Sequence, residues 1–488
     1  MSADSGIYPG RRAGPTDAFI DDGIADFGLA SNKKVLFFVL NSPLILSTIV
    51  SLSTLKRAIF GRDLRARCAL WVTLVLVATP AGADEFDIDF AALAALAPPT
   101  GTIIGADNVA LYLDLIDPDL AAHIAQGWLA ITVGAPLSFR PHEAYVAATE
   151  QYGGQAQLGT EAGEFLNYIA GRPFPGIPSV DDVRAGEKLA WNMRYGYSGD
   201  SAQIPEMYWY YIDMRSQKLE RVLEFVASQM RFKHRHVLKP IPELDKNPYD
   251  VFNAITLEAL APGDVAKTKL LIFYNSDDSQ VEQGWMYVPL LRRVRRVATT
   301  TRTDSFLGSD IMIEDFLGYS GRIMDMDWEY KGTRYVLLPM YSHADIVPSD
   351  KKARKYDYHF VGFHGHSGCF PNVSWQLRKT YILEGRPKRD NHPVGRRYFY
   401  IDAQTMFPVF GKIYDRADVL WKYAMGGLAH PDTHLESNRG SGVPMLDSSA
   451  VIDIQNMHCT ALQMLTLANV KKVKRREFEP SSLNVGAR

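Results

Sequence analysis

The sequence predicts a mainly β (α+β) protein built on a large antiparallel sheet. From about residue 186, short apolar or aromatic runs alternate with short connections that hold Asp, Gly or Pro. This spacing is typical of an antiparallel meander and not of βαβ units. The 24 Tyr, 23 Phe and 8 Trp residues suit strands. So many strands with one apolar face must curl or pack against other elements to bury that face.

Composition excludes several classes of protein. Lys plus Arg number 53 and Asp plus Glu 55, a formal net charge of −2, so nucleic acid is not expected as a partner. A hydrophobic content of 47% excludes wholesale disorder. Three cysteines are too few for a disulfide scaffold or a Cys-only zinc cluster. No Walker A sequence, dinucleotide fingerprint or CxxC motif occurs, and no cofactor is expected.

Residues 1–83 are predicted to be an export region. An uncharged apolar run at residues 68–80 follows three arginines and precedes an Ala-Gly-Ala site that ends at Ala83. This order is that of a secretory signal peptide, and the run is shorter than the roughly 20 apolar residues that a transmembrane helix needs. We therefore expect a periplasmic protein that is cleaved near Ala83.

The length of this region needs a separate explanation, because signal peptides usually have about 15–30 residues. We favour a gene start called too early, with the signal peptide at about residues 55–83. The alternative is an inner-membrane anchor through residues 35–55, an uncharged run long enough to span a bilayer. In an oxidising compartment Cys369 and Cys459 are able to pair, although the sequence leaves that bond open.

Residues 84–200 are predicted as a mixed region of helices and loops. Asp107 is a candidate helix cap, and the Gly- and Pro-rich stretch 170–178 does not suit regular structure. The expected elements are helices at 108–115, 118–127 and 143–151 and a strand at 128–133.

Residues 201–470 are predicted as the β domain, followed by a basic tail at 471–488. Five Lys and Arg residues between positions 471 and 476 are typical of a solvated tail. Contact with anionic lipid head groups is the functional alternative. The expected strands lie at 207–213, 219–232, 252–260, 266–274, 284–288, 293–299, 334–341, 375–384, 396–402, 407–415 and 418–425.

Several segments between residues 100 and 460 resemble one protein family. They are LNYIAGRPFPGIP (166–178), AGEKLAWNMRY (185–195), GWMYVPLLRRVRR (284–296), GSDIMIEDFLGYSG (308–321) and YFYIDAQTMFPVFGKIYDRADVLWK (398–422). The family is a Gram-negative periplasmic domain-of-unknown-function family, described as outer-membrane lipoprotein-sorting-like and similar in fold to the LolA/LolB carriers. The resemblance implies a half-barrel, a strongly curved antiparallel sheet with helices packed in its concave face. It also implies a hydrophobic ligand, and partners such as an RND-type exporter or an outer-membrane protein.

A curved sheet that its own side chains cannot fill leaves a pocket for an acyl chain or a polycyclic molecule. Alternation along the strands does not show which face is concave, so a place in a dry core is the alternative for each candidate. The candidate cavity residues are Trp209, Tyr211, Phe225, Phe273, Trp285, Tyr287, Tyr335, Leu337, Tyr398, Tyr400, Phe410 and Tyr414.

Four arginines form a candidate docking patch. Arg292, Arg293, Arg295 and Arg296 follow a turn. Guanidinium groups recognise an anionic lipid head group or an acidic partner surface, and transient membrane contact would follow. The alternative is a solvated strand edge whose charges discourage strand addition.

An acidic segment surrounds Gly308. Asp310 is predicted to cap a short helix at 311–317 that ends at Gly318. A divalent cation site is the alternative, although the spacing is not that of an EF-hand.

His364 and His366 lie two residues apart in the segment HFVGFHGHSGC (359–369). In a strand both would face one way, as a metal site requires. No standard zinc spacing is met, and Cys369 stands where the last Gly of a G-x-S-x-G nucleophile elbow would be. A surface loop is therefore favoured over a metal site or a serine hydrolase.

These observations favour a non-enzymatic periplasmic carrier or chaperone that binds a lipid or another hydrophobic molecule in a half-barrel cavity. One alternative is an envelope hydrolase or metal-dependent enzyme that uses residues 359–369. The other is a ligand-free protein that assembles an envelope complex. An apolar cavity in the fold distinguishes the first interpretation from the third.

Overall fold

The computed structural model describes residues 85–176, 178–297 and 302–484. The predicted export region at 1–83 lies outside the described residues. All described residues belong to one compact unit, Ala78–Arg488, and none of their helices is both long and apolar enough to cross a membrane. The fold is mainly β, as the sequence predicts, with one large sheet and few helices.

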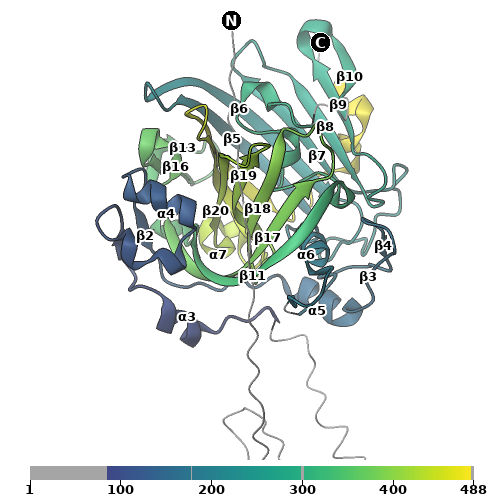
Figure 1. Cartoon of the computed structure of the whole chain (residues 1–488). Helices are drawn as coiled ribbons and strands as arrows, with labels where there is room; N and C mark the ends of the chain where they lie inside the picture. The colour runs from purple at the N-terminus through teal and green to yellow at the C-terminus, as the bar shows by residue number, and fades with distance from the viewer. Residues whose placement is uncertain (1–84, 177, 298–301, 485–488) are drawn as a thin grey trace, which may run out of the picture. The chain divides into compact units, whose positions relative to one another are not determined.

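The α-helices are short and lie mostly in the N-terminal part of the described chain (Figure 1). The Asp117 side chain accepts hydrogen bonds from two backbone N–H groups at the start of α4, and Pro118 occupies its first turn. The helix predicted at 108–115 is instead two separate 3₁₀ turns, Val109–Leu111 and Leu113–Leu115. The α-helices of the described residues are α3 (Phe90–Leu96), α4 (Pro118–Ala125), α5 (Glu143–Tyr152), α6 (Ala185–Arg194) and α7 (Pro431–His434).

The strands occupy most of the chain after residue 200, and the meander predicted there is confirmed. Two long strands, β21 and β22, are additional to the prediction. The strands are β1 (Ile103–Ile104), β2 (Ile131–Val133), β3 (Gln157–Leu158), β4 (Phe165–Leu166), β5 (Ser201–Asp213), β6 (Lys218–Arg231), β7 (Val251–Ala261), β8 (Lys269–Asn275), β9 (Gln283–Val288), β10 (Arg293–Val297), β11 (Met326–Leu338), β12 (Met340–Tyr341), β13 (Pro348–Lys352), β14 (His359–Val361), β15 (Phe363–His364), β16 (Phe370–Pro371), β17 (Ser374–Pro387), β18 (Val394–Asp402), β19 (Pro408–Asp415), β20 (Leu420–Ala429), β21 (Met445–Asp453) and β22 (His458–Ala468).

Sixteen of the described strands form one sheet. Its main order is β11-β17-β18-β19-β20-β21-β22-β5-β6-β7-β8-β9-β10, and each strand in this order is antiparallel to its neighbours. Two meanders, β5–β10 and β17–β22, therefore join where β22 pairs with β5. Strand β2 pairs in parallel with β17, and β12 pairs in parallel with β20.

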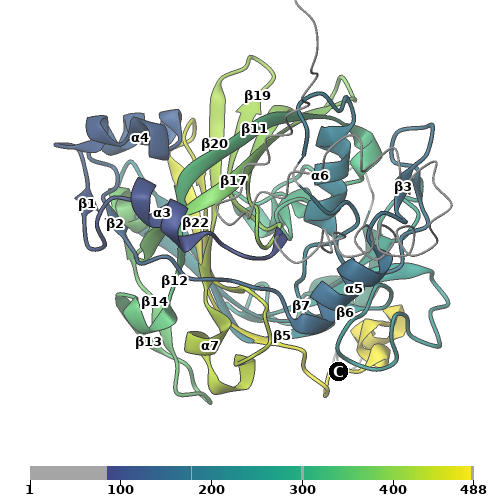
Figure 2. The ribbon, with the colours of Figure 1, turned by 90° about the horizontal axis from the view of Figure 1, so that it is seen from below.

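The sheet is strongly curved. Figure 2 shows its two meanders as two arms, with α6 lying between them. We call the face that encloses α6 the inner face and the opposite face the outer face. Side chains alternate between the two faces along each strand. In β5, for example, Met207 and Trp209 join the core cluster of the inner face, whereas Tyr208 packs against β14 on the outer face.

Helix α6 packs closely on the inner face. Its apolar residues Leu189, Trp191 and Met193 join the inner core cluster. Gly186 makes this approach possible, because a Cβ atom there would lie 2.5 Å from the carbonyl oxygen of Trp328 in β11. The expectation of helices packed in the concave face is met by α6, while α3, α4 and α5 contribute residues to the cluster of the outer face.

A long connection crosses the inner face. Strand β10 is at one end of the main strand order and β11 is at the other, so the chain between them must return across the width of the sheet. We call residues 302–325 the crossing segment. Its side chains Phe306, Ile311 and Tyr319 pack in the inner core cluster.

The cap predicted for Asp310 in this segment is wrong. A 3₁₀ turn, Ile313–Asp315, begins after Met312, and the Asp310 carboxylate instead accepts hydrogen bonds from His458 and Thr460 of β22, at 2.7 Å each. A tertiary contact with the sheet therefore replaces the local cap.

The C-terminal segment is not a solvated tail up to residue 484. Two 3₁₀ helices, Arg475–Phe478 and Pro480–Asn484, follow β22. The side chains of Val473, Phe478 and Leu483 are buried against the outer face of β6–β9. These apolar anchors hold the basic segment against the sheet.

Candidate ligand-binding cavity

A cavity of about 380 Å³ lies on the inner face, enclosed by both arms of the sheet, α6 and the crossing segment. This volume is within the range of small-molecule sites, about 300–1,000 Å³. Met193 of α6 and Ile311 and Phe316 of the crossing segment contribute to the part of the wall that the sheet does not supply.

The walls are mainly apolar because the strands point aliphatic and aromatic side chains inward. Met207 and Trp209 of β5 and Leu462 and Met464 of β22 line the cavity where the two arms meet. Ile204 and Ile255 of β5 and β7 also line it and are only half-buried. Solvent therefore reaches apolar groups inside the curve of the sheet, which is unusual for a filled core.

Small residues create part of this space. Gly411 of β19 pairs with Ala424 of β20, and both line the cavity together with Gly426. On the outer face of β20, by contrast, Tyr423 and Met425 are buried in a dense cluster. Around Gly411, Ala424 and Gly426 the inner face thus has only small side chains.

Ion pairs hold the crossing segment at the mouth of the cavity. Arg194 of α6 and Asp278 form a pair at 2.5 Å, and Asp278 also accepts hydrogen bonds from the backbone N–H groups of Ile323 and Met324. Burial alone would lower the pKa of Arg194, but the Asp278 carboxylate raises it, so that the guanidinium stays charged. The pair links α6 to the end of the crossing segment.

A second buried network anchors the middle of the crossing segment. Arg397 of β18 donates to Asp315 at 2.7 Å and also to Glu314, which His392 contacts from its other side at 3.3 Å. Burial would raise the pKa of Glu314, but the Arg397 guanidinium and His392 hold it at about 2. The ionised Glu314 and the hydrogen bond from Arg397 to Asp315 thus bind the crossing segment to the sheet.

Four polar side chains on the cavity wall have donors without acceptors among the described residues. The donors are Nε1 of Trp209, the hydroxyl of Tyr274, Nε of Arg397, and Nε and Nη1 of Arg231. Buried polar groups normally have partners. These atoms are therefore candidates for contacts with a polar part of a ligand.

The structure separates the twelve predicted cavity residues by the face on which their side chains pack. Trp209, Tyr211 and Phe225 belong to the inner core cluster, and Trp209 lines the cavity. Tyr398 and Phe410 also border the cavity, but their rings pack with neighbours of the outer face. The others pack on the outer face: Phe273, Trp285 and Tyr287 near the C-terminal segment, Tyr335, Leu337 and Tyr400 near the N-terminal region, and Tyr414 against Asp119 of α4.

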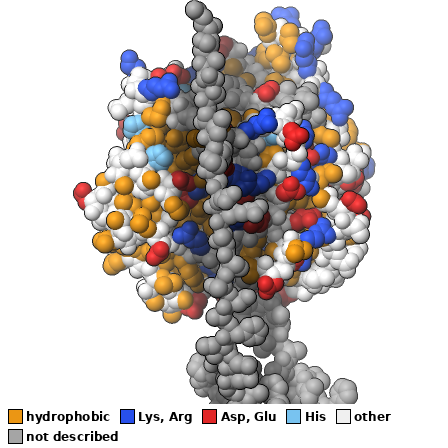
Figure 3. All heavy atoms as spheres, viewed as in Figure 1, with side chains coloured by type: hydrophobic (Ala, Val, Ile, Leu, Met, Phe, Trp, Pro, Cys, Tyr) orange, Lys and Arg blue, Asp and Glu red, His pale blue; other side chains and the backbone are white. Residues whose placement is uncertain are grey.

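The four predicted docking arginines are together at the tip of the β9–β10 hairpin. Arg292, Arg293, Arg295 and Arg296 are all exposed, and none forms an ion pair with another described residue. Leu290 at the same turn is 92% exposed. Figure 3 shows basic and hydrophobic side chains gathered over this hairpin, at the upper right of the view.

Some groups of the segment 359–369 are engaged, although Nε2 of His364 and Nε2 of His366 are buried without a hydrogen-bond partner among the described residues. Cys369 forms a disulfide with Cys459, so its thiolate is not available as a metal ligand or nucleophile. The Ser367 hydroxyl donates to a backbone carbonyl at 3.1 Å. His366 stacks on an indole ring, and burial lowers the pKa of His364. These contacts suit a packed connection on the outer face.

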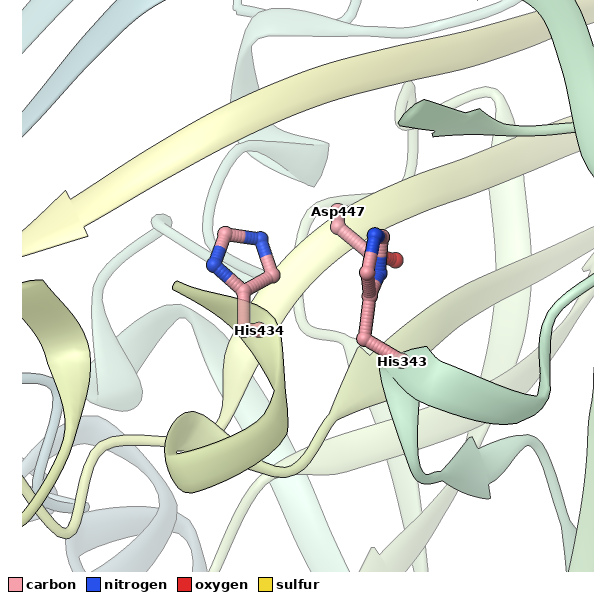
Figure 4. A group of neighbouring side chains, drawn as sticks. All are labelled: His343, His434 and Asp447. Carbon is pink, nitrogen blue, oxygen red and sulfur yellow. The ribbon is translucent and has the colours of Figure 1, made fainter. Parts of the chain in front are cut away.

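A histidine group that the sequence did not reveal lies elsewhere on the sheet (Figure 4). His343, His434 and Asp447 have ligand atoms within 4.8 Å of one another, and they form the one group of this kind found among the described residues. His343 Nδ1 lies 2.7 Å from the Asp447 carboxylate, which also accepts a hydrogen bond from Tyr341. Burial lowers the pKa of His434 to about 4.

The hydrogen bonds of His434 argue against metal ligation. The amide of Asn438 is oriented by two backbone groups: its oxygen accepts from Ala468 and its nitrogen donates to Thr466. The same nitrogen donates to His434 Nδ1 at 2.9 Å. In the neutral ring the proton then lies on Nε2, the atom directed toward Asp447. The group is therefore better described as a buried hydrogen-bonded cluster.

The fold is thus an open, strongly curved antiparallel sheet with an apolar, ligand-sized cavity on its inner face. The chain belongs to the DUF1329 family, described as proteins of unknown function, and the family model matches residues 103–484. This match confirms the resemblance to a domain-of-unknown-function family.

Solved structures with a similar fold include three at low sequence identity. A DUF1329 family protein from Desulfovibrio piger is 19% identical, with 62% of this chain and 99% of that chain covered and a TM-score of 0.43. A putative outer membrane lipoprotein-sorting protein domain from Vibrio parahaemolyticus is 14% identical (62% and 100% covered, TM-score 0.42). A LolA superfamily protein from Nitrosomonas europaea is 8% identical (62% and 98% covered, TM-score 0.34). Among curated proteins, no sequence matches.

Proposed function

We propose that the protein is a carrier that holds a hydrophobic molecule in the inner-face cavity and moves it within the cell envelope. The observation that carries this proposal is the cavity of about 380 Å³, whose wall is mainly aliphatic and aromatic and partly open to solvent. A ligand-free assembly protein would instead fill the inside of the curve with its own side chains. Burial of an apolar ligand there gains about 25 cal/mol per Å².

The crossing segment is proposed as the lid of the cavity. It supplies Phe316 and Leu317 to the wall, and Leu317 is 54% exposed. It is held by Arg397, by the contacts of Asp310 with β22 and by its buried side chains, so opening of the lid requires these contacts to break. Release of the ligand to an acceptor requires a higher affinity in the acceptor than in the carrier.

The proposed location is the periplasm, after cleavage near Ala83. The Cys369–Cys459 disulfide supports an oxidising compartment. The exposed arginines of the β9–β10 hairpin are proposed to contact anionic lipid head groups or an acidic surface of a partner, such as an RND-type exporter or an outer-membrane protein. The proposal assigns no catalytic reaction to the chain.

The test begins with the full chain expressed for export in a Gram-negative host. Native mass spectrometry of the purified protein, followed by organic extraction, should reveal a stoichiometric hydrophobic molecule. Stripped protein is then titrated with dibrominated stearic acid, which quenches nearby indoles. The quenching should fall in Trp209→Phe and stay unchanged in Trp285→Phe, whose indole packs on the outer face. A clean apo-protein that binds no brominated chain would overturn the carrier proposal.

A further inference from the structure

Arg231 is a buried cation at one end of the cavity. It is the last residue of β6, it lines the cavity, and it is 3% exposed. Its Nη2 donates to the carbonyl oxygen of Gly196 at 3.2 Å and to Oγ of Ser198 at 3.1 Å. Nε and Nη1 have no acceptor, and no carboxylate forms an ion pair with Arg231 among the described residues. The other arginines that line the cavity, Arg194 among them, are paired.

The neighbours of Arg231 do not neutralise it. The Asp200 carboxylate accepts hydrogen bonds from the backbone N–H groups of residues 236–238, at 2.6–3.1 Å. Arg235, also buried, donates only to backbone carbonyl oxygens. Burial lowers the pKa of His234 to about 3 and also lowers that of His236, so both rings are neutral. The region thus holds an excess of positive charge.

The cavity wall changes in character along β6. Ala227, Gln229 and Arg231 lie at alternate positions and therefore share the inner face. Gln229 donates to Asn253 of β7 at 3.1 Å, and both line the cavity. The wall is apolar at Ala227, polar at Gln229 and cationic at Arg231. This order matches a molecule with a long apolar part and one charged end.

We infer that the cavity takes an amphiphile, an apolar chain that ends in a single oxyanionic head, with the head at Arg231. The inference rests on the proposed carrier function. A buried charge is tolerated when it is paired and hydrogen-bonded, and a carboxylate or phosphate head supplies both the charge and the acceptors. The unpaired guanidinium nitrogens of Arg231 are buried in the cavity. A small anion therefore binds them more weakly than an amphiphile does, because the apolar chain of the amphiphile also contacts the cavity wall.

The test compares three amphiphiles that each have about sixteen carbon atoms: palmitate, hexadecyl phosphate and hexadecanol. Each displaces the neutral dye phenylnaphthylamine from delipidated full-chain protein. We expect the anions to bind roughly 10- to 100-fold more tightly than the alcohol. Arg231→Gln should remove that preference and leave the affinity for hexadecanol within about threefold. The relative affinities of palmitate and hexadecyl phosphate identify which head the site prefers.

Controls separate the possible failures. Arg416→Gln, an exposed arginine in the turn between β19 and β20 that does not line the cavity, should leave all three affinities unchanged. If palmitate, hexadecyl phosphate and hexadecanol bind wild type equally, the head-group inference is wrong and the carrier proposal stands. If neither the dye nor any ligand binds, the carrier proposal itself fails. Should Arg231→Gln not fold, the preference of wild type and of Arg231→Lys for anions over the alcohol decides the question.

Discussion

The cavity can be filled from within by one substitution, Ala227→Trp. Ala227 is half-buried on the inner face of β6, and its register neighbours are Ile204 of β5 and Leu257 of β7. All three line the cavity. An indole at position 227 therefore enters the space that the proposed ligand would occupy.

The expected loss of affinity follows from the area that the ligand gives up. An aromatic side chain of this size buries roughly 150–250 Å². If about 100 Å² of that replaces ligand surface, the loss at about 25 cal/mol per Å² is about 2.5 kcal/mol, or an about 60-fold higher Kd. The free energy of unfolding should change by no more than about 1 kcal/mol, because the indole enters space and does not overpack a filled core.

The assay is direct titration with phenylnaphthylamine, combined with thermal unfolding of each variant. Val226→Trp is the matched control. Val226 is the adjacent residue of β6, it is also half-buried, and it does not line the cavity. Its indole points to the outer face and should leave the Kd unchanged. A folded Ala227→Trp protein that binds the dye as tightly as wild type would refute the assignment of this cavity as the ligand site.

The remaining predictions concern the bonds that hold the fold around the cavity. Replacing Cys369 and Cys459 by alanine should lower the free energy of unfolding by about 4–5 kcal/mol, because the disulfide joins residues 90 apart. As a control, dithiothreitol should lower the urea midpoint of wild type and leave that of the double variant unchanged. Arg397→Met removes the guanidinium that pairs with buried Glu314, and the free energy of unfolding in urea should fall by about 3–5 kcal/mol. A loss below about 1 kcal/mol would contradict the anchoring role of Arg397. Glu314 has a pKa of about 2, below its ordinary 4.5. Its ionised form therefore stabilises the folded state fully above pH 4.5, and this stabilisation disappears as the pH falls toward 2. Wild type should lose stability in that window, and Arg397→Met should lose less. The pKa of His458 is raised above 6.5, mainly by its hydrogen bond to the Asp310 carboxylate. Protonated His458 therefore stabilises the folded state fully below pH 6.5, and this stabilisation is lost as the pH rises through the raised pKa. His458→Gln should therefore flatten the stability profile between about pH 5.5 and pH 8.5, by about 1 kcal/mol or less because the ring is partly exposed.

The sequence predicted strands best where one face is polar or where turns punctuate the chain. It missed β22, whose segment HCTALQMLTLA has no alternation and contains several good helix formers. This strand lies between β21 and β5 near the middle of the sheet, and nearly all its side chains are buried. A strand covered on both faces loses the period of two on which such predictions depend.

The prediction of cavity residues shows the same dependence on the tertiary structure. Trp209 and Phe273 have similar strand contexts, yet one packs on the inner face and the other on the outer face. A shift of one position along a strand reverses the face. The alternation of Ala227, Gln229 and Arg231 is visible in the sequence, but its meaning depends on the curvature that makes their face the inner one.

Local patterns in the sequence determined the predominance of antiparallel strands and the motifs that identify the family. The tertiary structure decided which face encloses a cavity, that Arg231 lies on it without an acidic partner among the described residues, and that Asp310 binds β22 instead of capping a helix. These features arise from the pairing of β22 with β5 and from the return of the chain across the inner face between β10 and β11. Both are contacts between residues far apart in the chain, which no local periodicity encodes.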